Sequence, residues 1–161
     1  LPSGPLREDI SSLKFYDNIF LNGNEENLID IKDEIKKINS KININHGKYV
    51  ALNIDDFDKN HNYMAFSGIG NHKTFINMLK NNNLKIINDL EFPDHYQYSK
   101  KDFNEIINNA KKYNAKIITT EKDYLRLDFF DKTEVLFIKS SLEILDEKNF
   151  IQTLINLNEN N

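Results

Sequence analysis

Strand-like apolar runs alternate with amphipathic helical stretches along most of this 161-residue chain, and this alternation is what most constrains the fold. Parallel strands need a crossover connection, usually a helix, whereas antiparallel strands can be joined by a short turn. The pattern therefore predicts an α/β fold, with a mainly parallel sheet and helices on both faces. The expected strands are 17–21, 63–67, 84–90, 115–119 and 134–138. One expected helix ends at about residue 38, two others span 71–81 and 100–113, and the last begins near residue 146.

The length is typical of one folded domain. We expect a motif-bearing lead-in segment at 1–16, an α/β/α domain at 17–155 and a frayed, Asn-rich tail at 156–161. The chain starts with leucine, and its first eight residues include two prolines and a glycine. We therefore expect it to be part of a longer protein.

Two additional β-patterned runs lie at 41–45 and 48–54. Only His46 and Gly47 separate them, and glycine is common in tight turns. The spacing predicts a hairpin or a strand-turn-strand connection.

Charge and composition argue against several classes of protein. The net charge is -4, without the basic excess typical of nucleic-acid binders, so no nucleic-acid partner is expected. Cysteine is absent, which excludes disulfides and thiolate metal sites, and no histidine pair has ligand spacing on a helix face, so no metal site is predicted. The sequence has no secretory segment or long apolar run, and a cytoplasmic location is the expectation.

Polar motifs follow four of the expected strands. They are SGIGN at 67–71, FPDHY at 92–96, TTEKD at 119–123 and KSS at 139–141. The carboxyl ends of parallel strands lie at the same edge of a sheet, where open α/β sheets usually bind ligands. We therefore expect one shared site at this edge.

The SGIGN motif follows a strand and opens a helix. Gly68 and Gly70 allow close approach of an anion to backbone N–H groups, with Asn71 at the start of the helix. Lys73 stands where a dinucleotide fingerprint has its third glycine, so that fingerprint is incomplete. Anion binding and a tight turn that only packs helix on sheet both remain open.

His95 is the candidate for acid-base chemistry, because imidazole titrates near neutral pH and Asp94 can orient it or balance its charge. Adjacent residues in an extended segment point to opposite sides, so the two side chains need not touch. The alternative is that Asp94 caps the following turn and His95 has no chemical role.

Glu121 and Lys122 follow a strand and can reach the same edge of the sheet. The alternative is structural: Thr120 caps a short helix and Asp123 answers it, as in a capping box. The chain has only two arginines, Arg7 and Arg126, among many lysines. Arginine is favoured where a planar, bidentate fork is needed, which makes Arg7 and, less strongly, Arg126 binding candidates.

The motifs LPSGPLRE at 1–8, AFSGIGN at 65–71, FPDHYQY at 92–98 and TTEKDYLRL at 119–127 together resemble the C-terminal half of tetraacyldisaccharide 4'-kinase. The resemblance covers nearly the whole chain. It implies transfer of the γ-phosphoryl group of ATP, with Mg²⁺, to the 4'-hydroxyl of an acylated glucosamine disaccharide 1-phosphate in lipid A biosynthesis. It also implies a location on the cytoplasmic face of the inner membrane, with peripheral membrane contact.

Specific residues take their roles from this resemblance. Arg7 and Glu8 would lie by the active site and hold nucleotide or substrate. His95 would approach the catalytic aspartate of another domain and support its work as a base. The family fold has two α/β/α domains joined by a two-stranded hinge, and the runs at 41–54 are candidates for the hinge strands.

The chain departs from the family pattern because it contains no GxxxxGK[ST] phosphate loop. Phosphoryl transfer depends mostly on positioning and charge stabilisation of the phosphates. We therefore expect that this chain alone does not turn over ATP and that a P-loop domain N-terminal to it is its missing partner. The alternative from another class is a noncatalytic α/β module that binds an anionic sugar or nucleotide.

Overall fold

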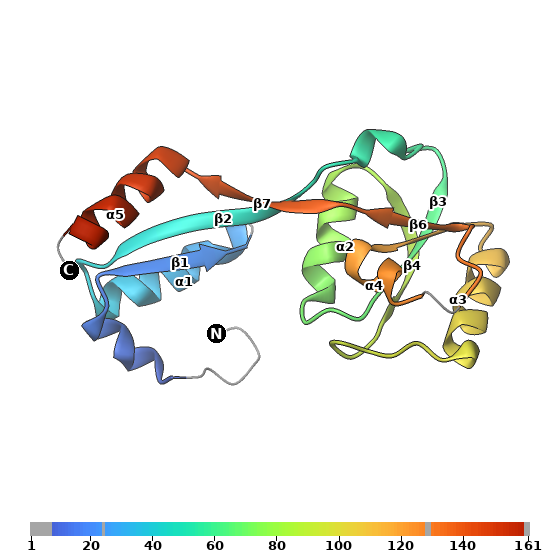
Figure 1. The fold of residues 1–161 in the computed structure, drawn as a ribbon, viewed down its shortest axis with the longest axis horizontal. Helices are drawn as coiled ribbons and strands as arrows, with labels where there is room; N and C mark the ends of the chain where they lie inside the picture. Colours follow the sequence, from blue (N-terminus) through green and yellow to red (C-terminus); the bar gives the residue numbers. More distant parts are fainter. Residues whose placement is uncertain (1–7, 24, 128–129, 160–161) are drawn as a thin grey trace. The chain divides into compact units, whose positions relative to one another are not determined.

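The computed structural model describes residues 8–23, 25–127 and 130–159. They form two compact units, one made of the residues up to Tyr49 and from Leu142 on, the other of Val50–Ser141. Each unit is built on its own sheet (Figure 1). This division differs from the single domain expected at 17–155, because apolar periodicity identifies strands but does not tell which of two sheets a strand joins.

The first unit is built on a three-stranded sheet of order β1-β2-β7. β1 and β2 are parallel, with Asn18 opposite Asn43. Helices α1 and α5 lie on opposite faces of this sheet (Figure 1). The elements that surround or form it are η1 (Ile10–Phe15), β1 (Asn18–Asn22), α1 (Glu25–Ile38), β2 (Asn43–Ala51), β7 (Ser140–Leu145) and α5 (Glu147–Glu159).

The predicted hairpin is wrong, because β2 runs without a turn through His46 and Gly47. His46 is buried, and its Nε2 lies 2.7 Å from the carbonyl oxygen of Gly23. A Cβ atom on Gly47 would lie 2.6 Å from the ring of Phe20. Gly47 therefore provides room for close packing inside a strand, which is the other common use of a glycine in a sheet.

The second unit has a four-stranded sheet of order β4-β3-β5-β6, and every neighbouring pair is parallel. The mainly parallel α/β fold predicted from the sequence is confirmed. The elements of this unit are η2 (Ile54–Asp56), β3 (Asn62–Ser67), α2 (His72–Asn81), β4 (Lys85–Glu91), α3 (Lys100–Lys112), β5 (Lys116–Thr120), α4 (Glu121–Leu125) and β6 (Val135–Ile138).

The central strand β3 is buried on both faces, and its side chains alternate between two apolar clusters. Tyr63 and Ala65 pack in the cluster that contains α2. Met64 and Phe66 pack in the cluster that contains α3. Helices therefore cover both faces of this sheet, as predicted.

The KSS motif and the C-terminal tail differ from what the sequence predicted. KSS at 139–141 is not a loop at the shared edge, because the Lys139 amide donates to Asn53 Oδ1 at 2.8 Å and β7 begins at Ser140. Helix α5 continues to Glu159, through most of the tail that was expected to fray at 156–161. Residues 160 and 161, like residues 1–7 of the lead-in, lie outside the described residues.

Candidate functional site

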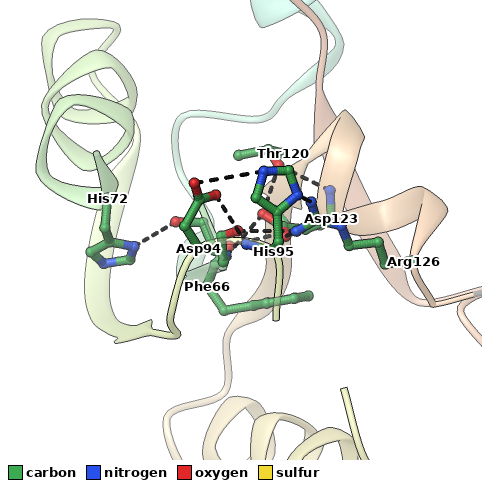
Figure 2. Close-up of polar contacts among 10 residues, drawn as sticks. Phe66, His72, Asp94, His95, Thr120, Asp123 and Arg126 are labelled. Atoms are coloured by element: carbon green, nitrogen blue, oxygen red, sulfur yellow. Dashed lines mark hydrogen bonds and ion pairs between the residues drawn. The ribbon is translucent and has the colours of Figure 1, made fainter. Parts of the chain in front are cut away.

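Two loops and a short helix meet at the carboxyl edge of the four-stranded sheet. They follow β3 (67–71), β4 (92–98) and β5 (120–126). In the sheet, β4 lies beside β3 at one end and β6 lies beside β5 at the other end. The chain therefore leaves β3 and β5 in opposite directions, and the strand order reverses between these two strands. Open α/β sheets usually bind ligands at this switch point. In this chain, a network of its own side chains fills it (Figure 2).

Asp123 is the centre of this network, and its side chain is 0% exposed. Its Oδ2 atom accepts hydrogen bonds from the Gly68 amide at 3.0 Å and from Thr120 Oγ1 at 2.7 Å. Its Oδ1 atom lies 3.1 Å from Arg126 Nη1. A buried carboxylate requires such partners, because burying an unpaired charge is very costly.

Arg126 joins these three segments. Its Nη1 donates to the Gly68 carbonyl at 3.0 Å as well as to Asp123, while its Nη2 lies 3.0 Å from Nδ1 of His95. The guanidinium is a rigid fork of donors, which suits several acceptors at once. Asp123 was not predicted as a site residue, and Arg126 was only the weaker of two arginine candidates; the scarcity of arginine was the one sequence signal for it.

His95 has a left-handed backbone, with φ 60°. Its amide donates to the Gly68 carbonyl at 3.1 Å and to Asp94 Oδ1 at 3.0 Å. Its side chain is 71% exposed, with Nε2 3.7 Å from Asp94 Oδ2. Figure 2 shows the imidazole between Asp94 and Arg126. Asp94 therefore does contact His95, and the ring is held on one side and accessible on the other.

The geometry of the SGIGN loop agrees with the tight-turn alternative. The Gly68 amide, an expected anion donor, already donates to the Asp123 carboxylate. Asn71 Oδ1 caps α2 by accepting from the Thr74 amide at 3.0 Å. A Cβ atom on Gly68 would lie 3.1 Å from the Pro93 carbonyl oxygen, whereas one on Gly70 would be 3.6 Å from the closest atom, on Asp94.

We expect Gly68→Ala to lower the free energy of unfolding by about 1–3 kcal/mol, because the new methyl group overpacks the contact between two loops. Gly70→Ala is the matched control and should change it by less than about 0.5 kcal/mol, since its loop position has room. Urea unfolding of both variants measures the difference. Equal stabilities would show that Gly68 is not needed for close approach.

Two further predicted site residues of this unit, Glu121 and Lys122, are not part of the network. Their side chains are exposed and make no hydrogen bond or ion pair with the described part of the chain. Thr120 caps α4, as in the structural alternative, by accepting from the Asp123 amide at 3.1 Å, while its hydroxyl donates to Asp123 Oδ2 at 2.7 Å. Glu8 accepts a hydrogen bond from the Tyr16 hydroxyl at 3.0 Å, and Arg7 lies outside the described residues.

A second polar array at the sheet edge was missed. Buried His72 lies between Ser67 Oγ, 2.7 Å from its Nδ1, and Asp89 Oδ2, 2.8 Å from its Nε2. Ser67 is 0% exposed, so its hydroxyl is not available to a substrate and the array ties α2 to β3 and β4. In the network around Asp123, burial raises the pKa of the Tyr98 hydroxyl, and the Asp123 carboxylate raises it further, so Tyr98 stays protonated.

Comparison with known proteins agrees with this fold. The family model for tetraacyldisaccharide-1-P 4'-kinase matches residues 1–159. The tetraacyldisaccharide 4'-kinase of Pelagibacter ubique is 70% identical over 161 residues, which are 100% of this chain and 51% of that protein. The enzyme of the same name from Rickettsia bellii is 40% identical over 155 residues, covering 93% of this chain and 46% of that protein. The chain thus spans about half the length of the curated relatives it matches.

Among solved structures, the crystal structure of LpxK from Aquifex aeolicus in complex with ATP matches 97% of this chain and 47% of that chain. The TM-score is 0.53 and the sequence identity is 22%, a likeness of fold. The family model covers nearly every residue, and three of the four motifs that carry the resemblance lie at the carboxyl edge of the four-stranded sheet. This chain therefore belongs to the tetraacyldisaccharide-1-P 4'-kinase family.

Proposed function

We propose that this chain is the carboxyl-terminal part of an ATP-dependent kinase that phosphorylates the 4'-hydroxyl of tetraacyldisaccharide 1-phosphate in lipid A biosynthesis. Besides family membership, the observation that carries the proposal is that His95 is held in position and yet exposed. Its backbone and Nδ1 are held by the loops around it, yet the side chain is 71% exposed. A side chain that acts on a group outside its own unit needs both a fixed position and an accessible face.

In this proposal, His95 supports the acid-base step. A carboxylate of the other half of the kinase would act as the base toward the sugar hydroxyl, and the exposed face of His95 would orient it or share its proton. Proton transfer by a positioned side chain typically contributes about 10²–10⁴-fold to a rate. Arg7 and Glu8 are proposed to contact nucleotide or substrate, by family analogy.

This chain supplies neither a phosphate loop for ATP nor, in the part that the structure describes, a cluster of ligands for Mg²⁺. The sequence has no GxxxxGK[ST] loop, and the part that the structure describes has no group of three or more His, Asp or Glu residues that could hold a metal ion. We assign no step to either group here. Both are proposed to bind to the half of the kinase that this chain does not cover.

No described helix is both long and apolar enough to cross a membrane. The proposed substrate carries four acyl chains, which would hold it in a bilayer. We propose that the kinase meets it as a peripheral protein on the cytoplasmic face of the inner membrane.

Phosphoryl transfer from labelled ATP to the lipid disaccharide tests the proposal. The assay compares this chain alone, the remaining half of the Pelagibacter ubique relative alone, and the two together. We expect transfer only from the mixture. Transfer by this chain alone would overturn the assignment of ATP and Mg²⁺ to the other half. A folded, associated mixture without transfer would contradict the kinase proposal and favour the noncatalytic binding module.

A further inference from the structure

We propose that Arg126 is a positioning residue, which holds the His95 imidazole as the tautomer with its proton on Nε2. The inference concerns the geometry of this chain, and its importance for phosphoryl transfer rests on the proposed function. Figure 2 shows Arg126 on one side of the ring and Asp94 on the other.

The tautomer follows from the donors and acceptors at each nitrogen. The guanidinium of Arg126 has only N–H donors and no acceptor. Its Nη2 lies 3.0 Å from Nδ1 of His95, so Nδ1 must accept, through a lone pair. In the neutral ring the proton is then on Nε2, and the N–H faces the accessible side, where the Asp94 carboxylate is 3.7 Å away.

The position of Arg126 is itself fixed. Nη1 has two hydrogens, and both have partners, the Gly68 carbonyl at 3.0 Å and Asp123 Oδ1 at 3.1 Å. Its side chain is only 16% exposed and its partner Asp123 is 0% exposed. With Nη1 anchored in this way, the planar fork directs Nη2 at His95.

The backbone of His95 is held by the same loop. Its amide donates to the carbonyl of Gly68, the atom that also accepts from Arg126. With φ 60°, the backbone of His95 is in the left-handed region. Bulky residues are rare in this region, although histidine adopts it more readily than most residues. A lysine at 126 could not reproduce the contact, because one ammonium nitrogen cannot reach three acceptors in the directions of a fork.

Long-range ¹H–¹⁵N NMR spectra of this chain test the tautomer directly, since the two ring nitrogens of each tautomer have distinct shifts. The chain has only four histidines, so each ring can be assigned by single substitutions. At about pH 8, above the ordinary pKa of imidazole near 6.5, we expect His95 as the pure Nε2–H form. Wild-type His95 as the Nδ1–H form, or as a mixture of both forms, would overturn the inference without any variant.

The variant Arg126→Lys should convert the His95 signals to a mixture of tautomers. His72 reports on the fold in the same spectrum, because its ring lies between Ser67 and Asp89, away from Arg126. The matched control is Lys122→Ala, which removes an exposed cation from α4, the helix whose C-cap is Arg126, and should leave the His95 signals unchanged. Unchanged His95 signals in a folded Arg126→Lys protein would contradict the inference.

The kinase assay separates this inference from the proposed function. In the reconstituted kinase, Arg126→Lys should lower kcat at least tenfold without a matching change in KM, and combining it with a His95 substitution should add little further loss. Additive losses would show that Arg126 does not act through His95. A confirmed tautomer with full activity of the His95 variants would leave the geometry established and contradict the proposed function of His95.

Discussion

Replacing Asp123 with alanine is expected to lower the free energy of unfolding by about 3–5 kcal/mol, the usual cost of removing one partner of a buried ion pair. The Arg126 side chain, which is only 16% exposed in this structure, would lose its carboxylate partner. The Gly68 amide and the Thr120 hydroxyl would lose their acceptor as well. Chemical denaturation of the purified chain, monitored by circular dichroism, measures the loss.

Lys122→Ala is the matched control, since Lys122 lies in the same short helix, is exposed and has no hydrogen-bond or ion-pair partner among the described residues. Its free energy of unfolding should stay within about 0.5 kcal/mol of the wild type. A loss of less than about 1 kcal/mol in Asp123→Ala would show that the network at the switch point does not stabilise the fold, because that is no more than an average substitution costs.

His95→Ala in the reconstituted kinase is expected to lower kcat by about 10²-fold or more and to leave KM nearly unchanged. The physical reason is that a positioned acid-base group acts mainly in the transition state. Because His95 has φ 60°, His95→Asn is the better-matched variant: asparagine tolerates this backbone region and has no titratable ring. Steady-state kinetics of both variants, with thermal unfolding as a check of folding, gives the comparison.

His61 provides the control for this experiment. It is also exposed and lies beside a carboxylate, with Nδ1 2.8 Å from Asp58 Oδ2, but it belongs to the polar segment before β3. His61→Ala should leave kcat unchanged. Full activity of both His95 variants would mean that His95 has no chemical role, the alternative left open by the sequence.

Element types and their order were predictable from this sequence because they depend on local patterns. Apolar runs and amphipathic stretches predicted β3 to within one residue and α3 to within one. The capping alternative for TTEKD was also readable, since Thr120 and Asp123 are three residues apart. The missed strand β7 has a weaker local signal, because four of its six residues are exposed and two are serine.

The candidate site was predictable only in outline. Mapping polar motifs to strand ends correctly predicted that the segments holding Gly68, Asp94 and Asp123 converge, because parallel strands share a carboxyl edge, but it wrongly added KSS at 139–141. It did not predict which side chains meet. In the sequence, Glu121, Lys122 and Asp123 look alike as charged residues after a strand, yet only Asp123 is buried.

By itself, therefore, the sequence determined the α/β class, the helices on both faces and the edge of the sheet where the polar loops gather. Only the tertiary structure decided that Asp123 and Arg126 fill the switch point and that Arg126 holds the ring of His95. The physical reason is the separation along the sequence between the residues that interact. Periodicity and capping act between residues a few positions apart. The contacts of Arg126 with His95 and Gly68, and of Asp123 with Gly68, join residues 31, 58 and 55 positions apart, which strand order and register bring together.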